Sequence, residues 1–381
     1  MNACDRPTSI RSLPYLVLAL LLVGLLPAYA EDAGRAAQIE QSFRQRDKNG
    51  DGVLSAEEVG NPEMFKRLDA NGDGQVTLAE AQAFFAAQGN QPPTPPPPVG
   101  PDQSFTPLTD LGANQYQGFP GGLYPNGANT PPAAYLQQGL AAARTVQPLS
   151  PTGDPSPTGA VVLLSIGMSN TTMEFSAFQR LANADPAKNP SLIIVDGAQG
   201  GQDATKIKDP AAPFWTTVDQ RLTAAGVTAA QVQVAWIKEA IAGESRTFPA
   251  DAQELQDDLA AILQIMETRY PHLRLVYVSS RIYAGYATTR LNPEPVAYQG
   301  GFAVKWFVED RIKQPTPGPW VAWGPYLWTD GVRGRADGLV WNREDCGPDG
   351  THPSPRGCAQ VADLLLKFFQ TDETARGWFV K

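Results

Sequence analysis

The stretch LLSIGMSNTTMEF, residues 163–175, joins an apolar run to a polar segment that favours a helix. Its first residues end the run GAVVLLSI (159–166), and four similar runs follow: SLIIVDG (191–197), VQVAWI (232–237), LRLVYVSS (273–280) and PWVAW (319–323). Helical patterns separate them, at 214–225, 250–268, 301–312 and 355–369. Apolar strands alternating with amphipathic helices predict an α/β domain with a parallel sheet covered on both faces.

Ser169 follows the first of these strands and precedes the helix expected near Thr171. In parallel sheets the ligand site lies outside the carboxyl ends of the strands, so the Ser169 hydroxyl is a candidate nucleophile. Helix N-terminal amides at this place can stabilise an oxyanion. The alternative is a plain N-cap, because serine caps helices well. The sequence is not the G-x-S-x-G elbow of α/β-hydrolases, because Thr171 stands where the second glycine would be.

A serine nucleophile needs a base, usually a histidine oriented by a carboxylate. The chain has two histidines. His272 precedes a strand, at the wrong end of the sheet, and we interpret it as a solvated or capping residue. His352 lies in DCGPDGTHPSPRGC (345–358), three residues after Asp349 and before the last long helix. An Asp-x-x-His turn can place the carboxylate against one ring nitrogen and leave the other for Ser169.

This order of Ser169, Asp349 and His352 resembles the SGNH (GDSL-type) serine hydrolases over about residues 159–369. The resemblance implies a flavodoxin-like three-layer α/β/α fold and an esterase activity. It also implies an oxyanion hole made by the amide of Ser169, a glycine after the second strand, and an amide side chain after the third. VDGAQGGQDA (195–204) offers Gly200 and Gly201 and is similar to a block of the carbohydrate-esterase branch. Its alternative reading is an ordinary glycine-rich turn.

The third block departs from the family pattern. Lys238 stands where the carbohydrate-esterase branch has the glutamine of W-x-Q-G-E. Its ammonium can support an oxyanion by charge, or it can mark a displaced loop or an altered reaction. After the fourth strand, Arg281 and Tyr283 reach the same sheet edge, either as pocket residues or as structural ones. Cys346 and Cys358 bracket the predicted acid and base, and we expect them to form a disulfide.

Two further stretches, DKNGDGVLSAEE (47–58) and DANGDGQVTLAE (69–80), match the EF-hand pattern D-x-[DN]-x-[DN]-G-x5-E. Oxygens at positions 1, 3, 5, 7 and 12 surround the ion, and glycine at position 6 allows the sharp turn. The alternative is a pair of acidic turns without metal. Residues 35–88 resemble the EF-hand family closely, and we expect a structural rather than a regulatory role for calcium. The predicted calcium ligands are Asp47, Asn49, Asp51, Val53 (carbonyl), Glu58, Asp69, Asn71, Asp73, Gln75 (carbonyl) and Glu80.

The first thirty residues read as a signal peptide. Arg6 and Arg11 precede the apolar run at 15–26, and Ala28-Tyr29-Ala30 gives a small-x-small cleavage site. The alternative, a membrane anchor, is disfavoured because the run is short for a span of ~20 residues. We therefore expect a secreted or periplasmic protein without a membrane partner after cleavage. An oxidising compartment of this kind allows a disulfide to persist.

The composition organises the rest of the chain. The 381 residues predict several domains, and QPPTPPPPVGP (91–101) predicts an extended linker. The expected order is signal peptide (1–30), EF-hand pair (35–90), linker (91–101), irregular segment packed on the hydrolase domain (102–158) and hydrolase domain (159–381). The net charge of −9 argues against nucleic acid as a partner.

The sequence thus predicts a secreted serine esterase acting on short acyl, chiefly acetyl, esters, with carbohydrate esters as one substrate class. Calcium is the expected cofactor of the EF-hands, and catalysis is expected to need none. Two alternatives stay open. One is a non-catalytic, calcium-dependent binding or cell-surface protein with a degenerate hydrolase domain. The other is an enzyme gated by calcium.

Overall fold

The computed structural model describes residues 39–40, 43–44, 46–59, 62–90, 104–243, 247–314 and 317–381. The predicted signal peptide (1–30) and linker (91–101) lie outside these residues. The chain separates into two compact units, Met1–Thr94 and Pro95–Lys381. Within the described ranges, no helix is both long and apolar enough to span a bilayer.

The smaller unit is built on a short antiparallel ladder between the two acidic loops. Strand β1 (Val53–Leu54) pairs with β2 (Val76–Thr77), with Leu54 opposite Val76. Leu54 and Val76 are buried together with Phe43, which precedes the first loop. Helices whose bounds lie within the described residues of this unit are α2 (Ala56–Val59), α3 (Pro62–Leu68) and α4 (Leu78–Asn90). The ladder therefore joins the two loops through a common apolar core.

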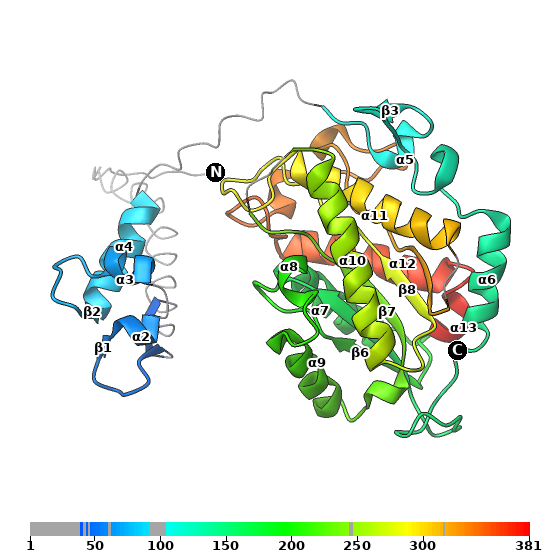
Figure 1. The fold of residues 1–381 in the computed structure, drawn as a ribbon, viewed down its shortest axis with the longest axis horizontal. Helices are drawn as coiled ribbons and strands as arrows, with labels where there is room; N and C mark the ends of the chain where they lie inside the picture. Colours follow the sequence, from blue (N-terminus) through cyan, green and yellow to red (C-terminus); the bar gives the residue numbers. More distant parts are fainter. Residues whose placement is uncertain are drawn as a thin grey trace, which may run out of the picture. The chain divides into compact units, whose positions relative to one another are not determined.

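The larger unit is built on a five-stranded parallel sheet in the order β6-β5-β7-β8-β9 (Figure 1). The strands are β5 (Val161–Gly167), β6 (Leu192–Asp196), β7 (Val232–Lys238), β8 (Leu275–Val278) and β9 (Trp320–Trp323). Numbered from the first strand, this order is 2-1-3-4-5, the flavodoxin-like topology. All five strands lie within the runs expected from the sequence or extend one residue past them, and the predicted fold class is confirmed.

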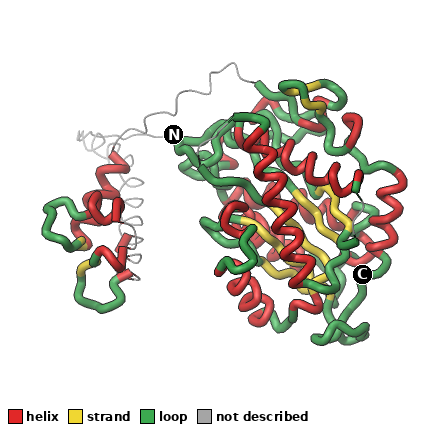
Figure 2. Tube along the Cα trace, viewed as in Figure 1, coloured by secondary structure: helices red, strands yellow, loops and turns green. Residues whose placement is uncertain are grey.

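Helices cover both faces of the sheet, and the side chains of β5 alternate between the two layers. Val162 and Leu164 belong to one core, while Val161 and Leu163 belong to the other. Figures 1 and 2 show helices of the first layer in front of the strands and α12 behind them. The first layer holds α8 (Ala204–Ile207), α9 (Pro213–Ala224), α10 (Ala250–Arg269) and α11 (Val296–Lys313). The second holds α6 (Ala133–Ala143), α7 (Ser169–Ala184), α12 (Pro355–Thr371) and α13 (Arg376–Phe379).

The segment before the first strand packs onto the large unit, but it is less irregular than the sequence predicts. Helix α6 has the alanine-rich sequence AAYLQQGLAAA, which favours a helix. The hydroxyl of its Tyr135 donates to the Val321 carbonyl of β9. Phe105 stacks on Tyr298 of α11, with ring centroids 4.9 Å apart. The other elements here are α5 (Leu108–Leu111), β3 (Gln115–Tyr116), β4 (Phe119–Pro120) and η1 (Pro125–Gly127). The short 3-10 turns η2 (Ala229–Gln231), η3 (Gly331–Arg333) and η4 (Arg343–Asp345) lie further along the chain.

Candidate active site

Ser169 begins α7, two residues after β5 ends, at the carboxyl edge of the sheet. The helix starts here, two residues earlier than the sequence predicts. Met168, the residue before it, has an extended backbone and therefore marks the amino end of the helix. The amide of Ser169 is one of the first amides of α7 and so has no acceptor within the helix. The nucleophile candidate therefore stands beside a positive helix end.

The loop between η4 and α12 brings His352 and Asp349 to this serine. The Ser169 Oγ lies 2.7 Å from His352 Nε2, and His352 Nδ1 lies 2.5 Å from Asp349 Oδ2. With Asp349 accepting from Nδ1–H, Nε2 is left to accept the serine proton. Asp349 and His352 lie three residues apart in one loop, 183 residues from Ser169 in the case of His352, and the three side chains form one continuous hydrogen-bonded chain. His272 lies before β8 and is not one of these three hydrogen-bonded residues.

The Asp349 carboxylate is held in its charged form by its own loop. Burial alone would raise its pKa, but hydrogen bonds from the His352 ring and from the amides of His352 and Thr351 outweigh burial and hold the pKa at about 2. The turn itself requires a glycine at residue 350. Gly350 has φ +67, and a Cβ added to it would lie only 1.7 Å from the Tyr286 carbonyl oxygen. The loop is therefore shaped to keep a carboxylate against the imidazole.

A side chain that the sequence prediction missed ties this loop to α7. Asn170, next to the nucleophile, is 1% exposed, and its Nδ2 donates to the Thr351 carbonyl at 2.9 Å. Because Thr351 precedes His352, this bond joins the segments of nucleophile and base directly. The sequence signal was weak, since an asparagine after a helix-starting serine is ordinary capping chemistry.

The two glycines predicted for the oxyanion hole differ in their surroundings. A Cβ built on Gly200 would lie 3.9 Å from the Ser169 Cβ, whereas one on Gly201 meets nothing within 4 Å. The amides of Gly200 and Gly201 donate no hydrogen bond to any residue in the described ranges. Gly200 is therefore the glycine that approaches the nucleophile, and its backbone amide is free to donate to a substrate oxygen.

Lys238 lies elsewhere than the sequence suggests. It ends β7 beside Gly167, but its side chain is 2% exposed and turns under α7. There its Nζ lies 2.7 Å and 2.5 Å from the two carboxylate oxygens of Glu174, which is fully buried. The ammonium is thus occupied by an ion pair and is not open to a substrate oxygen. The sequence could not show this, because Glu174 sits among apolar neighbours that alone suggest a packed helix face.

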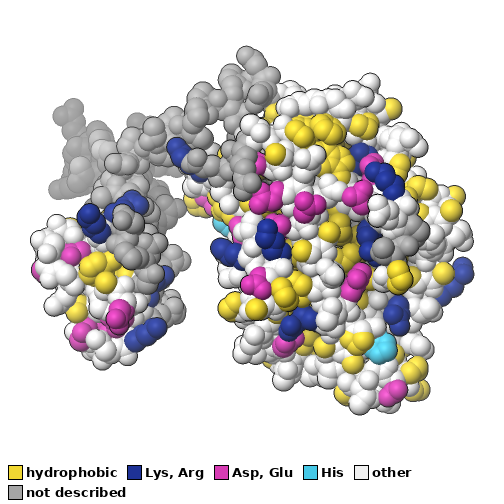
Figure 3. All heavy atoms as spheres, viewed as in Figure 1, with side chains coloured by type: hydrophobic (Ala, Val, Ile, Leu, Met, Phe, Trp, Pro, Cys, Tyr) yellow, Lys and Arg dark blue, Asp and Glu magenta, His cyan; other side chains and the backbone are white. Residues whose placement is uncertain are grey.

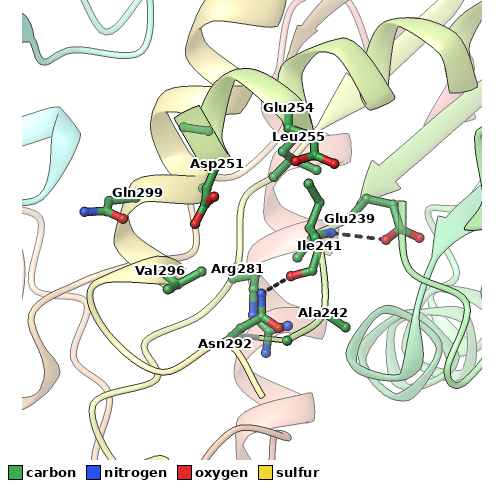
Figure 4. Close-up of a pocket in the computed structure, with 14 residues that line it drawn as sticks. Glu239, Ile241, Ala242, Asp251, Glu254, Leu255, Arg281, Asn292, Val296 and Gln299 are labelled. Carbon is green, nitrogen blue, oxygen red and sulfur yellow. Dashed lines mark hydrogen bonds between the residues drawn. The ribbon is translucent and has the colours of Figure 1, made fainter. Parts of the chain in front are cut away.

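A cavity of about 130 Å³ lies past the ends of β7 and β8 (Figure 4). Arg281, a predicted pocket residue, lines it, and Figure 4 shows its side chain beside that of Asn292. The three guanidinium nitrogens of Arg281 are enclosed and have no hydrogen-bond partner among the described residues. Burial raises the pKa of Glu239, in the cavity wall, well above its usual range. Tyr283, the other predicted residue, instead packs against Tyr286 and Trp328.

A second, open hollow borders the triad itself. His352 and Asp349 line it together with Met173, whose side chain is 39% exposed. Methionine is flexible and polarisable, so its side chain adapts to apolar groups of varied shape. An ester can therefore reach His352 from solvent.

The expected disulfide is not formed. Cys346 and Cys358 are both free and buried. Burial raises the pKa of each thiol to about 11, so little of the reactive thiolate is present at neutral pH. Spacing along a loop does not fix how two Cβ atoms are directed, which is why the sequence pattern misled.

The acidic loops of the smaller unit have EF-hand geometry. In the first loop, Glu58 Oε1 accepts from the Lys48 amide at 3.0 Å, so position 12 folds over position 2. Gly52 at position 6 has φ +83, as does Gly74 in the second loop. Hydrogen bonds from the Ser55 amide and hydroxyl hold the pKa of Glu58 below its usual range. The donor set is all oxygen and mostly carboxylate, which suits calcium.

Comparison with known proteins agrees with this part of the chain. The family model "EF hand" matches residues 39–61 and 63–85, which indicates calcium binding. No curated protein matches the chain. Figure 3 shows acidic side chains on both units, on the face that it draws.

Several solved structures resemble part of the chain at low identity. An acetylxylan esterase mutant from Geobacillus stearothermophilus is 15% identical, with a TM-score of 0.34, over 59% of this chain and 99% of that one. A putative acylhydrolase from Bacteroides fragilis is 11% identical, with a TM-score of 0.33, over 64% and 97%. A gut microbial diltiazem-metabolizing enzyme is 16% identical, with a TM-score of 0.32, over 60% of this chain and about half, 49%, of its own length.

Fold and site are thus a parallel sheet with helices on both faces and a hydrogen-bonded Ser169–His352–Asp349 chain at its carboxyl edge, in a protein whose residues 39–61 and 63–85 match the EF-hand model.

Proposed function

We propose that this chain is an exported serine esterase of the SGNH type that hydrolyses short-chain acyl esters, chiefly acetyl esters. The observation that carries the proposal is the 2.7 Å contact between Ser169 Oγ and His352 Nε2, backed by Asp349 on the other ring nitrogen. A serine, a base and an orienting carboxylate in this order are the requirements for nucleophilic catalysis.

The reaction follows from this geometry. Ser169 Oγ attacks the ester carbonyl as its proton moves to His352 Nε2, and Asp349 stabilises the imidazolium that forms. The amides of Ser169 and Gly200 are the donors proposed for the oxyanion. The imidazolium then returns its proton to the leaving alcohol, and an acyl-serine remains. Water, deprotonated by His352, releases the acid and restores Ser169.

The surroundings of the triad support small acyl groups and a broad alcohol part. Gly200 faces Ser169 closely, whereas the hollow beside His352 is open and holds the exposed Met173. Carbohydrate acetyl esters are the substrate class that the resemblance favours, and the calcium sites are proposed to be structural. The export proposal rests on the sequence of residues 1–30.

The test is hydrolysis of p-nitrophenyl acetate together with labelling by a fluorophosphonate probe. Wild type is expected to turn over the ester and to be labelled. Ser169→Ala should lose labelling, and Ser169→Ala and His352→Ala should each lose about 10⁶-fold in kcat. A folded wild type that neither hydrolyses nor labels would instead support the non-catalytic calcium-dependent binding protein. A panel of acetylated sugars and longer acyl esters then ranks the substrates.

A further inference from the structure

The end of β7 holds the start of α7 at two separate points. The Thr171 hydroxyl donates to the Lys238 carbonyl at 2.6 Å, and the Lys238 ammonium contacts both carboxylate oxygens of Glu174. Thr171 and Glu174 are two and five residues after Ser169 on the same helix. One residue of β7 therefore fixes the first turns of the helix that carries the nucleophile.

The packing around these contacts leaves little room for movement. Gly167 of β5 pairs with Lys238 in the sheet, and a Cβ on Gly167 would come within 2.4 Å of the Thr171 hydroxyl and 2.5 Å of the Lys238 carbonyl. Strand β5, strand β7 and helix α7 thus meet without a gap directly behind Ser169. A side chain at residue 167 would push the helix away.

The charges at this point are enclosed. Lys238 and Glu174 are 2% and 0% exposed, and burial works against the charged form of each. Their mutual attraction opposes burial, and the charge of Arg281 also favours the Glu174 carboxylate. In such surroundings an ion pair is costly to break, so its geometry is tightly set.

We propose that Lys238 and Glu174 are positioning residues that set the location of Ser169 relative to His352. This inference rests on the proposed esterase function, and it assigns to Lys238 a role in holding α7 in place of a role at the oxyanion. Neither residue touches the reacting atoms, so both act through the helix.

The decisive variant is Lys238→Met/Glu174→Leu, which replaces both charged side chains by apolar ones and removes the tie between β7 and α7. A buried pair replaced as a unit is often neutral for stability, so this variant is expected to keep a Tm near that of wild type. Its kcat on p-nitrophenyl acetate and its rate of fluorophosphonate labelling should both fall at least about tenfold, with KM changed less than about twofold. A matched control is Lys305→Met/Glu309→Leu, a pair (2.7 Å) on α11, on the other face of the sheet, with Lys305 1% and Glu309 14% exposed, and it should keep wild-type kcat.

The outcomes separate the two proposals. Wild-type kcat in a folded double variant overturns the positioning role and leaves the esterase function standing. Absence of activity and labelling in wild type overturns the esterase function first. If the double variant does not fold, Thr171→Val decides, because it removes the second tie without touching a charge. A lower kcat at unchanged KM then supports positioning, and a wild-type kcat overturns it.

Discussion

The Asn170 side chain donates to the Thr351 carbonyl at 2.9 Å and so joins the residue after the nucleophile to the residue before the base. Ser169 and His352 come from segments 183 residues apart, and their 2.7 Å contact depends on how those segments meet. A hydrogen bond at this junction fixes the spacing without taking part in proton transfer. The same junction leads to the first prediction.

Asn170→Ala should lower both stability and turnover. It leaves the Thr351 carbonyl without its buried donor, which costs about 1–3 kcal/mol in the free energy of unfolding. A shift of the triad segments should lower kcat by about ten- to a hundredfold. Urea denaturation and steady-state kinetics measure the two effects. Asn129→Ala is the control, because Asn129 makes the same kind of bond, to the Thr109 carbonyl at 2.8 Å, at an exposed place. Equal kcat losses in both variants would contradict the junction role.

Gly200→Val and Gly201→Ala should have opposite effects. Gly200 is not in the left-handed region, so a larger side chain is tolerated by its backbone but projects toward Ser169. We expect a strong loss of kcat/KM, about tenfold or more, with little change in Tm. Gly201 has φ +72, so alanine there should cost about 1–2 kcal/mol of stability. Its kcat per folded molecule should stay near wild type. Thermal melts and kinetics distinguish the two, and the reverse pattern would move the oxyanion donor to Gly201.

Glu294 predicts a stability change with pH. Burial raises its pKa to about 7, although the Ala284 and Tyr298 amides and the Trp328 indole donate to it. The native state therefore keeps a proton that the unfolded chain releases near pH 4.5. Its contribution to stability is complete below that pH and is lost as pH rises to about 7, with an amplitude on the order of 3 kcal/mol.

Glu294→Gln should remove this component. Unfolding free energies from urea titrations at pH 4, 5, 6, 7 and 8 give the slope for each protein, and only the slopes are compared, because glutamine also changes the local hydrogen bonds. The wild-type slope should be the more negative between pH 5 and 7. Parallel slopes would show that Glu294 does not titrate as described.

Because both cysteines are free, a reductant should not affect the activity or the stability of the protein. Dithiothreitol should change neither kcat nor Tm, because Cys346 and Cys358 are unpaired in the folded protein. Iodoacetamide added after unfolding, without reductant, should modify both residues, and it should react slowly with the native protein because both thiols are buried. Peptide mass spectrometry gives the readout. A cross-linked peptide containing both cysteines would contradict the structure.

The acidic loops predict two calcium sites whose loss spares the chemistry. Glu58→Gln and Glu80→Gln each remove a bidentate carboxylate at loop position 12 and should weaken calcium binding at their own loop by roughly tenfold or more, measured by calorimetry. EGTA should leave kcat on p-nitrophenyl acetate unchanged, since the triad uses no metal. A fall in kcat that calcium restores would favour the calcium-gated enzyme.

The sequence was sufficient for the sheet because its strands are buried on both faces. Such strands appear as uninterrupted apolar runs, and their order along the chain implies parallel pairing. The proximity of Ser169, Asp349 and His352 could also be predicted, because one lies at a strand end and the other two are three residues apart in one turn; their catalytic role stays a prediction. Local spacing carries that information.

What depends on long-range side-chain direction could not be predicted. The Lys238 ammonium turns under α7 to meet Glu174, 64 residues away in sequence, and nothing near either residue indicates the partner. The predicted disulfide between Cys346 and Cys358 was wrong for the same reason, because their spacing is compatible with a bond but does not set the directions of the two thiols. Helix α6 was missed because the glycines and prolines around it outweighed its own alanine-rich composition.

The pairing of Lys238 with Glu174 also restricts which substitutions evolution can accept at residue 238. Changing Lys238 to the glutamine found at this place in the carbohydrate-esterase branch would leave the Glu174 carboxylate buried without its cation, at a cost of about 3–5 kcal/mol. Much of a typical domain's stability would be lost in that one step. A change at residue 238 would therefore need a compensating change at Glu174. The amino acid at residue 238 is constrained by its buried partner, whatever it contributes to the placing of α7.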